Sequence, residues 1–187
     1  MRCAGIKVKT PPEGLPVTQG EFVEHARING ITVQVQPALL DRQLSAATWR
    51  AEVFMRRSIL TQTLEGTFTS DGSDCACALQ LTLPRGDVQS VTSVTDGQGT
   101  AITGYTLAGN VITLASPAYY SPVTVVWVSG YGDDAAAVPD TVREGILEYA
   151  TTLYEDRVGA REAKYAAGAH GVPVGVHDLW RSEQIEV

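Results

Sequence analysis

The chain has 187 residues, a hydrophobic content of 44% and a formal net charge of -7 at pH 7. This length allows one domain with a buried core and leaves little room for two enzymatic halves. Only three of the 14 basic residues are lysines, and no basic patch typical of a nucleic-acid-binding protein is visible. The apolar runs are too short to span a bilayer and the N-terminus has no hydrophobic signal-peptide core, so we expect a soluble cytoplasmic product without membrane contact.

Residues 1–17 are interrupted by prolines and glycines. These residues disfavour regular structure, so we expect an extended N-terminal arm instead of a packed element. A single domain is then expected at residues 18–165, with three helices and an inserted β module.

The first helix is expected at residues 18–29, because Thr18 and Glu21 have the spacing of a capping box. The second is expected at residues 37–60, where apolar residues recur at steps of four and three. The third, at residues 139–157, starts at a proline and carries one apolar stripe. We expect the three stripes to pack together as a small helical core.

Between these helices, residues 61–129 alternate threonine, serine and valine and are cut by turn sequences. This pattern predicts an antiparallel β meander or sandwich, and it makes the expected fold class α+β. The candidate strands are Thr63–Thr69, Ala78–Leu83, Val88–Thr95, Ile102–Leu107, Val111–Ala115 and Val123–Val128.

The β module carries little charge, with five acidic residues, a single basic residue, Arg85, and no lysine. Exposed strand edges are normally protected by lysine. One interpretation is that other subunits cover these edges. The alternative is a compact sheet whose threonine and serine side chains face water.

No catalytic, metal or cofactor site is predicted. The three histidines, His25, His170 and His177, lack a Gly-x-Ser-x-Gly partner motif, and there is no phosphate-binding glycine loop. The acidic pairs Asp133-Asp134 and Glu155-Asp156 do not form a catalytic spacing, because adjacent carboxylates point in different directions. The segment 71–74 is read as a hairpin turn. Three thiols are expected to stay reduced: Cys3, Cys75 and Cys77.

Residues 166–187 are expected to form a flexible C-terminal tail that docks onto a partner, because a glycine-rich linker precedes apolar and aromatic anchors. The alternative is that the tail folds back on its own domain. The candidate docking residues are Val172, Pro173, Val174, Val176, Leu179, Trp180 and Ile185.

Three landmarks in order resemble the head-tail connector proteins of tailed bacteriophages, prophages and gene transfer agents. They are an N-terminal helix pair, LPRGDVQSVTSVTDGQG at Leu83–Gly99, and VSGYGDDAAAVPDTVREGILEYATTLYEDR at Val128–Arg157. The segment GVPVGVHDLW at Gly171–Trp180 is similar to the closing segment of that family. The long β module departs from shorter members, which are mainly helical.

The resemblance implies a structural virion protein in the neck between head and tail, without enzymatic activity. Such an adaptor, or head-completion protein, would form a homo-oligomeric ring of twelve subunits under the portal protein. A stopper or tail-completion protein would bind the opposite face, and DNA would pass through the lumen without specific binding.

Two other classes remain open at this point. Stopper and tail-terminator proteins are also small, acidic and ring-forming. A small β-rich hydrolase or carbohydrate-binding module is the lesser alternative, supported only by the β module and by scattered His, Asp and Trp residues.

Overall fold

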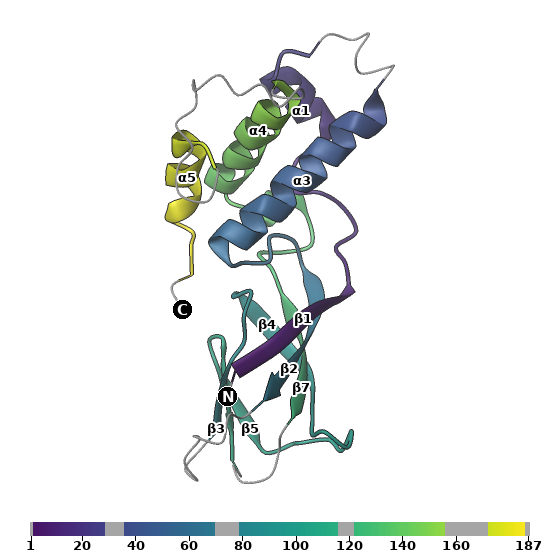
Figure 1. Ribbon diagram of the computed structural model, residues 1–187, viewed down its shortest axis with the longest axis vertical. Helices are drawn as coiled ribbons and strands as arrows, with labels where there is room; N and C mark the ends of the chain where they lie inside the picture. The colour runs from purple at the N-terminus through teal and green to yellow at the C-terminus, as the bar shows by residue number, and fades with distance from the viewer. Residues whose placement is uncertain (1, 29–35, 70–78, 116–121, 156–171, 186–187) are drawn as a thin grey trace. The chain divides into compact units, whose positions relative to one another are not determined.

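The computed structural model describes residues 2–28, 36–69, 79–115, 122–155 and 172–185. The chain divides into two compact units. Met1–Pro12 and Thr61–Asp133 make up the β unit, and Glu13–Leu60 and Asp134–Val187 make up the helical unit. Helices and antiparallel sheets are both present, so the α+β class expected from the sequence is confirmed (Figure 1). The division between the two units falls within residues 18–165, which were expected to form one domain. That these residues act together as one adaptor domain stays a prediction.

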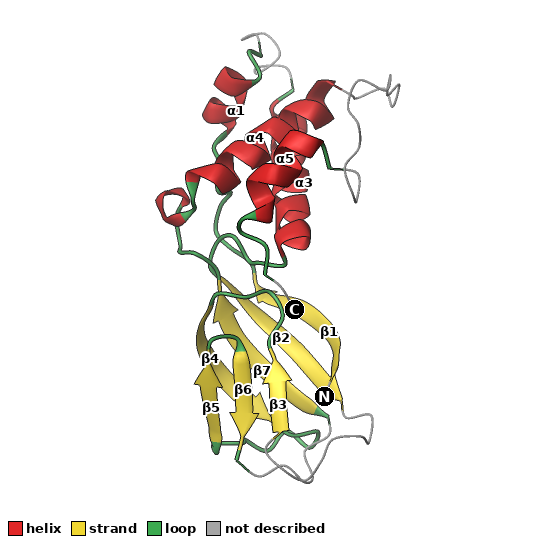
Figure 2. Cartoon of the chain, turned by 90° about the vertical axis from the view of Figure 1, so that its left-hand side faces the viewer, coloured by secondary structure: helices red, strands yellow, loops and turns green. Residues whose placement is uncertain are grey.

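The β unit is a sandwich of two antiparallel sheets (Figure 2). The larger sheet has the strand order β1-β2-β7-β4 and the smaller sheet has the order β3-β6-β5. The strands are β1 (Arg2–Thr10), β2 (Gln62–Thr69), β3 (Leu79–Thr82), β4 (Val88–Thr95), β5 (Tyr105–Ala108), β6 (Val111–Leu114) and β7 (Val123–Ser129). Side chains from both sheets share one core, because alternate residues of each strand point inward.

The order of the strands departs from a simple meander, in which each strand pairs with the next. Among the described strands, only β1 with β2 and β5 with β6 are consecutive strands that pair with each other. β7 instead lies between β2 and β4, and five of its seven residues are buried. Alternation identifies which side chains point inward but does not specify the neighbouring strand. Of the two arrangements expected for the β module, a meander or a sandwich, the structure has the sandwich.

The N-terminal arm requires a correction, since Arg2–Thr10 is a strand that pairs antiparallel with β2. The prolines and glycine that suggested an arm all follow this strand. Within the strand, apolar Ile6 and Val8 alternate with Lys7 and Lys9, which is the period of a β-strand. Every described side chain from Cys3 onward in β1 is nevertheless exposed.

The helical unit contains α1 (Gln19–His25), α3 (Pro37–Met55), the 3-10 helix η1 (Ala135–Ala137), α4 (Asp140–Glu155) and α5 (Val174–Arg181). The predicted capping box is confirmed: the backbone N–H of Glu21 donates to the Thr18 side chain, and the N–H of Thr18 donates to the Glu21 carboxylate. The second predicted helix overshoots, because α3 ends where Arg56 adopts a left-handed conformation with φ of 55°. Apolar spacing alone gave no signal for that end.

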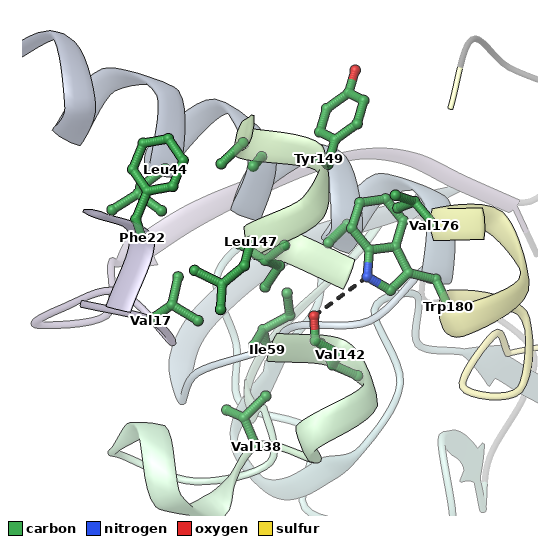
Figure 3. Packing of buried hydrophobic residues seen from close by; sticks show 14 of the residues in the cluster. Val17, Phe22, Leu44, Ile59, Val138, Val142, Leu147, Tyr149, Val176 and Trp180 are labelled. Carbon is green, nitrogen blue, oxygen red and sulfur yellow. Dashed lines mark hydrogen bonds between the residues drawn. The ribbon is translucent and has the colours of Figure 1, made fainter. Parts of the chain in front are cut away.

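The apolar stripes of α1, α3 and α4 form one core, as expected (Figure 3). Phe22 of α1, Leu44 of α3 and Ile146 of α4 are fully or almost fully buried in it. α5 is a fourth member that was not predicted, since eight residues beside a glycine-rich stretch give a weak helical pattern. No helix among the described residues is both long and apolar enough to cross a membrane.

Candidate assembly surfaces

The described histidines do not form a catalytic arrangement. His25 Nδ1 lies 3.6 Å from a carboxylate oxygen of Glu144, and His177 Nδ1 lies 3.5 Å from that of its neighbour Asp178. His177 also packs edge-on against Phe54, with ring centroids 5.0 Å apart. In the described part of the chain, no group of three or more His, Cys, Asp or Glu side chains is placed to hold a metal ion.

The acidic pairs have structural or solvent-facing positions. The Asp134 carboxylate accepts hydrogen bonds from the N–H groups of Ala136 and Ala137 and so caps η1. Asp133 and Glu155 are exposed. Several residues considered in the sequence lie outside the described ranges: Cys75, Cys77, residues 71–74, Asp156 and His170.

Part of the C-terminal segment belongs to the core of the helical unit. Val172, Val176 and Trp180 are fully buried, and the Trp180 Nε1–H donates a 3.4 Å hydrogen bond to the Val142 carbonyl (Figure 3). Described residues 172–185 therefore follow the alternative in which the tail folds back on its own domain.

The other candidate docking residues differ in exposure. Val174 is 51% exposed, whereas Pro173, Leu179 and Ile185 are partly buried. The N–H of Ile185 donates to the Met55 carbonyl at 3.1 Å, which ties the segment to the end of α3. Docking of this segment onto a portal stays a prediction, and the buried residues now have a second role in the core.

The edge of the larger sheet carries the lysines that the β module itself lacks. Lys7 Nζ lies 3.0 Å and Lys9 Nζ lies 3.7 Å from the Glu65 carboxylate on β2. The Lys7 hydrogen bond and charge hold the pKa of Glu65 below its ordinary value. Since lysine on an edge strand discourages pairing with another chain, β1 is protected, and the absence of lysine at residues 61–129 is a weaker argument for covered edges than the sequence suggested.

A second apolar stripe lies on the solvent side of α3. Trp49 is 59% and Val53 is 39% exposed, on the side of the helix opposite the buried Leu40, Leu44, Ala47 and Ala51. We call Arg42, Ala46, Trp49, Arg50, Val53 and Arg56 the α3 outer face. This face was not predicted from the sequence, although the spacing of Ala46, Trp49 and Val53 is a visible signal.

A shallow hollow of about 290 Å³ adjoins this face, lined by Arg50, Val53, Phe54, Arg56 and Gln184. The Gln184 side chain is fixed there by a 3.1 Å hydrogen bond from Nε2 to the Phe54 carbonyl. Two guanidinium groups beside an apolar surface are suited to bind a carboxylate that has a hydrophobic group next to it.

An acidic surface lies elsewhere on the same unit. We call Glu21, Glu24, Asp140 and Glu144 the acidic α1–α4 face; Arg143 and His25 lie among them. Arg143 binds the Glu21 carboxylate, and its Nη1 lies 3.3 Å from Asp140. The hydrogen bond from the Thr18 backbone is the largest effect and lowers the pKa of Glu21. Burial, the next largest effect, opposes it, and the Thr18 side chain and the Arg143 charge lower the pKa further.

No protein-family model and no curated protein sequence matches the chain. Its fold is similar to that of chains in solved particles. One comes from the neck of an empty GTA particle computed with C6 symmetry, with a TM-score of 0.74, 20% identity, and coverage of 98% of this chain and 97% of that chain. A second comes from the virion of a native gene transfer agent (GTA) particle, with a TM-score of 0.68, 20% identity, and coverage of 97% and 96%.

A third chain comes from the neck of a native GTA particle computed with C12 symmetry; its TM-score is 0.68, its identity 20%, and the coverage 98% of this chain and 97% of that chain. At this identity the likeness establishes the fold. These three structural neighbours are chains of GTA particles, two of them from necks, and the shared fold extends over nearly the whole length of both partners.

Proposed function

We propose that the protein is a structural, non-enzymatic component of the neck of a tailed particle, such as a phage, a prophage-derived particle or a GTA. The observation that carries this proposal is the near-complete coverage of both chains in the comparison with a GTA neck, 98% and 97%. A match confined to a common β-sandwich or a helical hairpin would not support a specific role. Here the helices and the sandwich occur together in the same chain.

Within the neck, the proposed role is an adaptor ring of twelve subunits that surrounds the DNA exit channel. A portal protein would bind one side and a stopper or tail-completion protein the other. The C6 and C12 symmetries of the solved necks are compatible with twelve copies. The net charge of -7 suits a lumen through which DNA slides without being held.

Only part of the C-terminal segment is proposed to contact a portal. Because Val172, Val176 and Trp180 belong to the core, the residues left to touch a portal are the more accessible ones: Pro173, Val174, Leu179 and Ile185. Val174 offers the largest exposed apolar surface among them.

Crosslinking of purified particles followed by mass spectrometry tests the adaptor role. An adaptor should give crosslinks both to the portal and to a tail-side neck protein. Crosslinks to tail-side proteins without any to the portal would contradict the adaptor role and favour a stopper or tail terminator. Absence of the chain from particles would contradict the whole proposal.

A further inference from the structure

The outer face of α3 combines an exposed tryptophan with positive charge. Trp49 and Val53 lie together on the solvent side of the helix, 59% and 39% exposed. A solvated helix face usually carries charged and polar residues, so an exposed indole beside a valine is typical of an interface. Contact with another protein would remove the apolar surface of this indole from water, and that surface does not contribute to the helical core of its own chain.

Three arginines, Arg42, Arg50 and Arg56, give this face positive charge. Arg50 Nε is buried without a hydrogen-bond partner among the described residues, and Arg50 lines the hollow together with Arg56. Guanidinium groups that line a hollow can form charge-assisted hydrogen bonds with a carboxylate that enters it. The face is therefore suited to an acidic protein surface with an apolar neighbour.

The chain presents such an acidic surface on the acidic α1–α4 face. The Asp140 side chain is 98% and the Glu144 side chain 56% exposed, and Glu24 is exposed as well. Arg143 compensates Glu21 and part of the charge of Asp140, and His25 Nδ1 lies 3.6 Å from Glu144. Glu24 and Glu144 are thus accessible carboxylates that are not paired with Arg143.

We propose that the α3 outer face of one subunit binds the acidic α1–α4 face of a second copy of this chain. The inference rests on the proposed ring function. A ring is built from heterologous contacts, in which two different surfaces of each subunit meet, and closure requires them to be complementary. One aromatic-basic surface and one acidic surface on different helices of the same unit satisfy that requirement.

Charge reversal tests this contact in assembled particles. One variant carries Arg50→Glu and Arg56→Glu, a second carries Glu24→Arg and Glu144→Arg, and a third carries all four changes. The number of copies per particle is measured by quantitative mass spectrometry, and thermal unfolding of each purified chain shows whether it folds. Trp49→Ala is measured in the same way, because an exposed side chain can be truncated without disturbing the core.

Each double variant should lose about tenfold or more in incorporation, which corresponds to about 1.4 kcal/mol per contact, and the four-substitution variant should regain most of it. Trp49→Ala should also lower incorporation while keeping the unfolding temperature. Normal incorporation of the double variants and of Trp49→Ala would overturn the proposal, as would a combined variant that regains nothing. Normal incorporation with lost DNA transfer would point to a DNA contact and would overturn it too.

A failure of this contact can be distinguished from a failure of the proposed function. If the wild-type chain is present in the neck and the substitutions have no effect, only the contact between copies is wrong. If the wild-type chain is absent from particles, the neck function fails, and the contact inference fails with it.

Discussion

Gly145 of α4 and Trp180 of α5 lie so close that a methyl group at position 145 would come within 2.3 Å of the indole Nε1. The same indole nitrogen donates to the carbonyl of Val142, one turn earlier on α4. The glycine therefore provides the room in which the C-terminal helix packs on the third predicted helix. Two elements separated along the chain by residues 156–171 are joined through this contact.

Gly145→Ala should destabilise the helical unit by about 1–3 kcal/mol, because the new methyl group overlaps a buried ring. The sign of this change in the free energy of unfolding tests the packing, because replacing glycine by alanine inside a helix ordinarily stabilises the helix by about 1 kcal/mol. Chemical denaturation monitored by circular dichroism measures the change. Gly20→Ala in α1 is the matched control, because its nearest neighbour would be Thr18 Oγ1 at 3.8 Å; it should be neutral or slightly stabilising. Equal effects of the two substitutions would contradict the packing described.

Trp180→Ala should cost about 3–5 kcal/mol of stability, because the side chain is fully buried among Tyr149, Phe54 and Val176. Trp49→Ala is the control with the same chemistry on an exposed site and should change the free energy of unfolding by less than about 0.5 kcal/mol. The difference between the two variants, measured in denaturant, reports whether the C-terminal segment belongs to the folded core. A stable Trp180→Ala protein would return that segment to the role of a separate docking tail.

Gly66→Ala should destabilise the β unit. A methyl group there would lie 2.9 Å from two ring carbons of Trp127, which is fully buried between the sheets. Overpacking of this kind costs about 1–3 kcal/mol. Gly5→Ala on β1 would meet nothing within 4 Å and should have little effect. Hydrogen exchange measured by mass spectrometry should show faster exchange in β2 and β7 for Gly66→Ala; unchanged protection there would argue against the close contact.

The stability of α1 should depend on pH through Glu21. Hydrogen bonds from Thr18 and the charge of Arg143 lower the pKa of this carboxylate in the folded state. Its contribution is therefore complete above the ordinary pKa of 4.5 and is lost as the pH falls through the lower folded value. Glu21→Gln keeps a residue suited to the capping box but cannot titrate. Wild type should lose more stability than Glu21→Gln between neutral pH and pH values below 4.5; parallel curves would show that the cap carries no charge-dependent stability.

Local signals in the sequence were sufficient for several elements. The capping box at Thr18 and Glu21 and the strand Val88–Thr95 are found as predicted, because hydrogen bonds between near neighbours and side-chain alternation act within a few residues. The apolar stripe of the third predicted helix is likewise buried where its spacing indicated.

Long-range pairing could not be derived in the same way. β1 pairs with β2, which follows it by more than fifty residues. No local pattern within Arg2–Thr10 indicates which strand it pairs with. The fourth helix depends on a complementary space at Gly145, which only the folded unit provides. The α3 outer face was overlooked for a related reason: Trp49 and Val53 are apolar, and pattern reasoning assigns apolar residues to a core.

Cryo-electron microscopy of intact particles from a producing cell, with the chain carrying a small C-terminal tag, tests the central claim most directly. The neck proposal predicts a closed ring of this chain between the capsid portal and the tail, with tag density repeated around the channel. Particles that contain a complete neck without this chain, or that carry it elsewhere in the virion, would contradict the account.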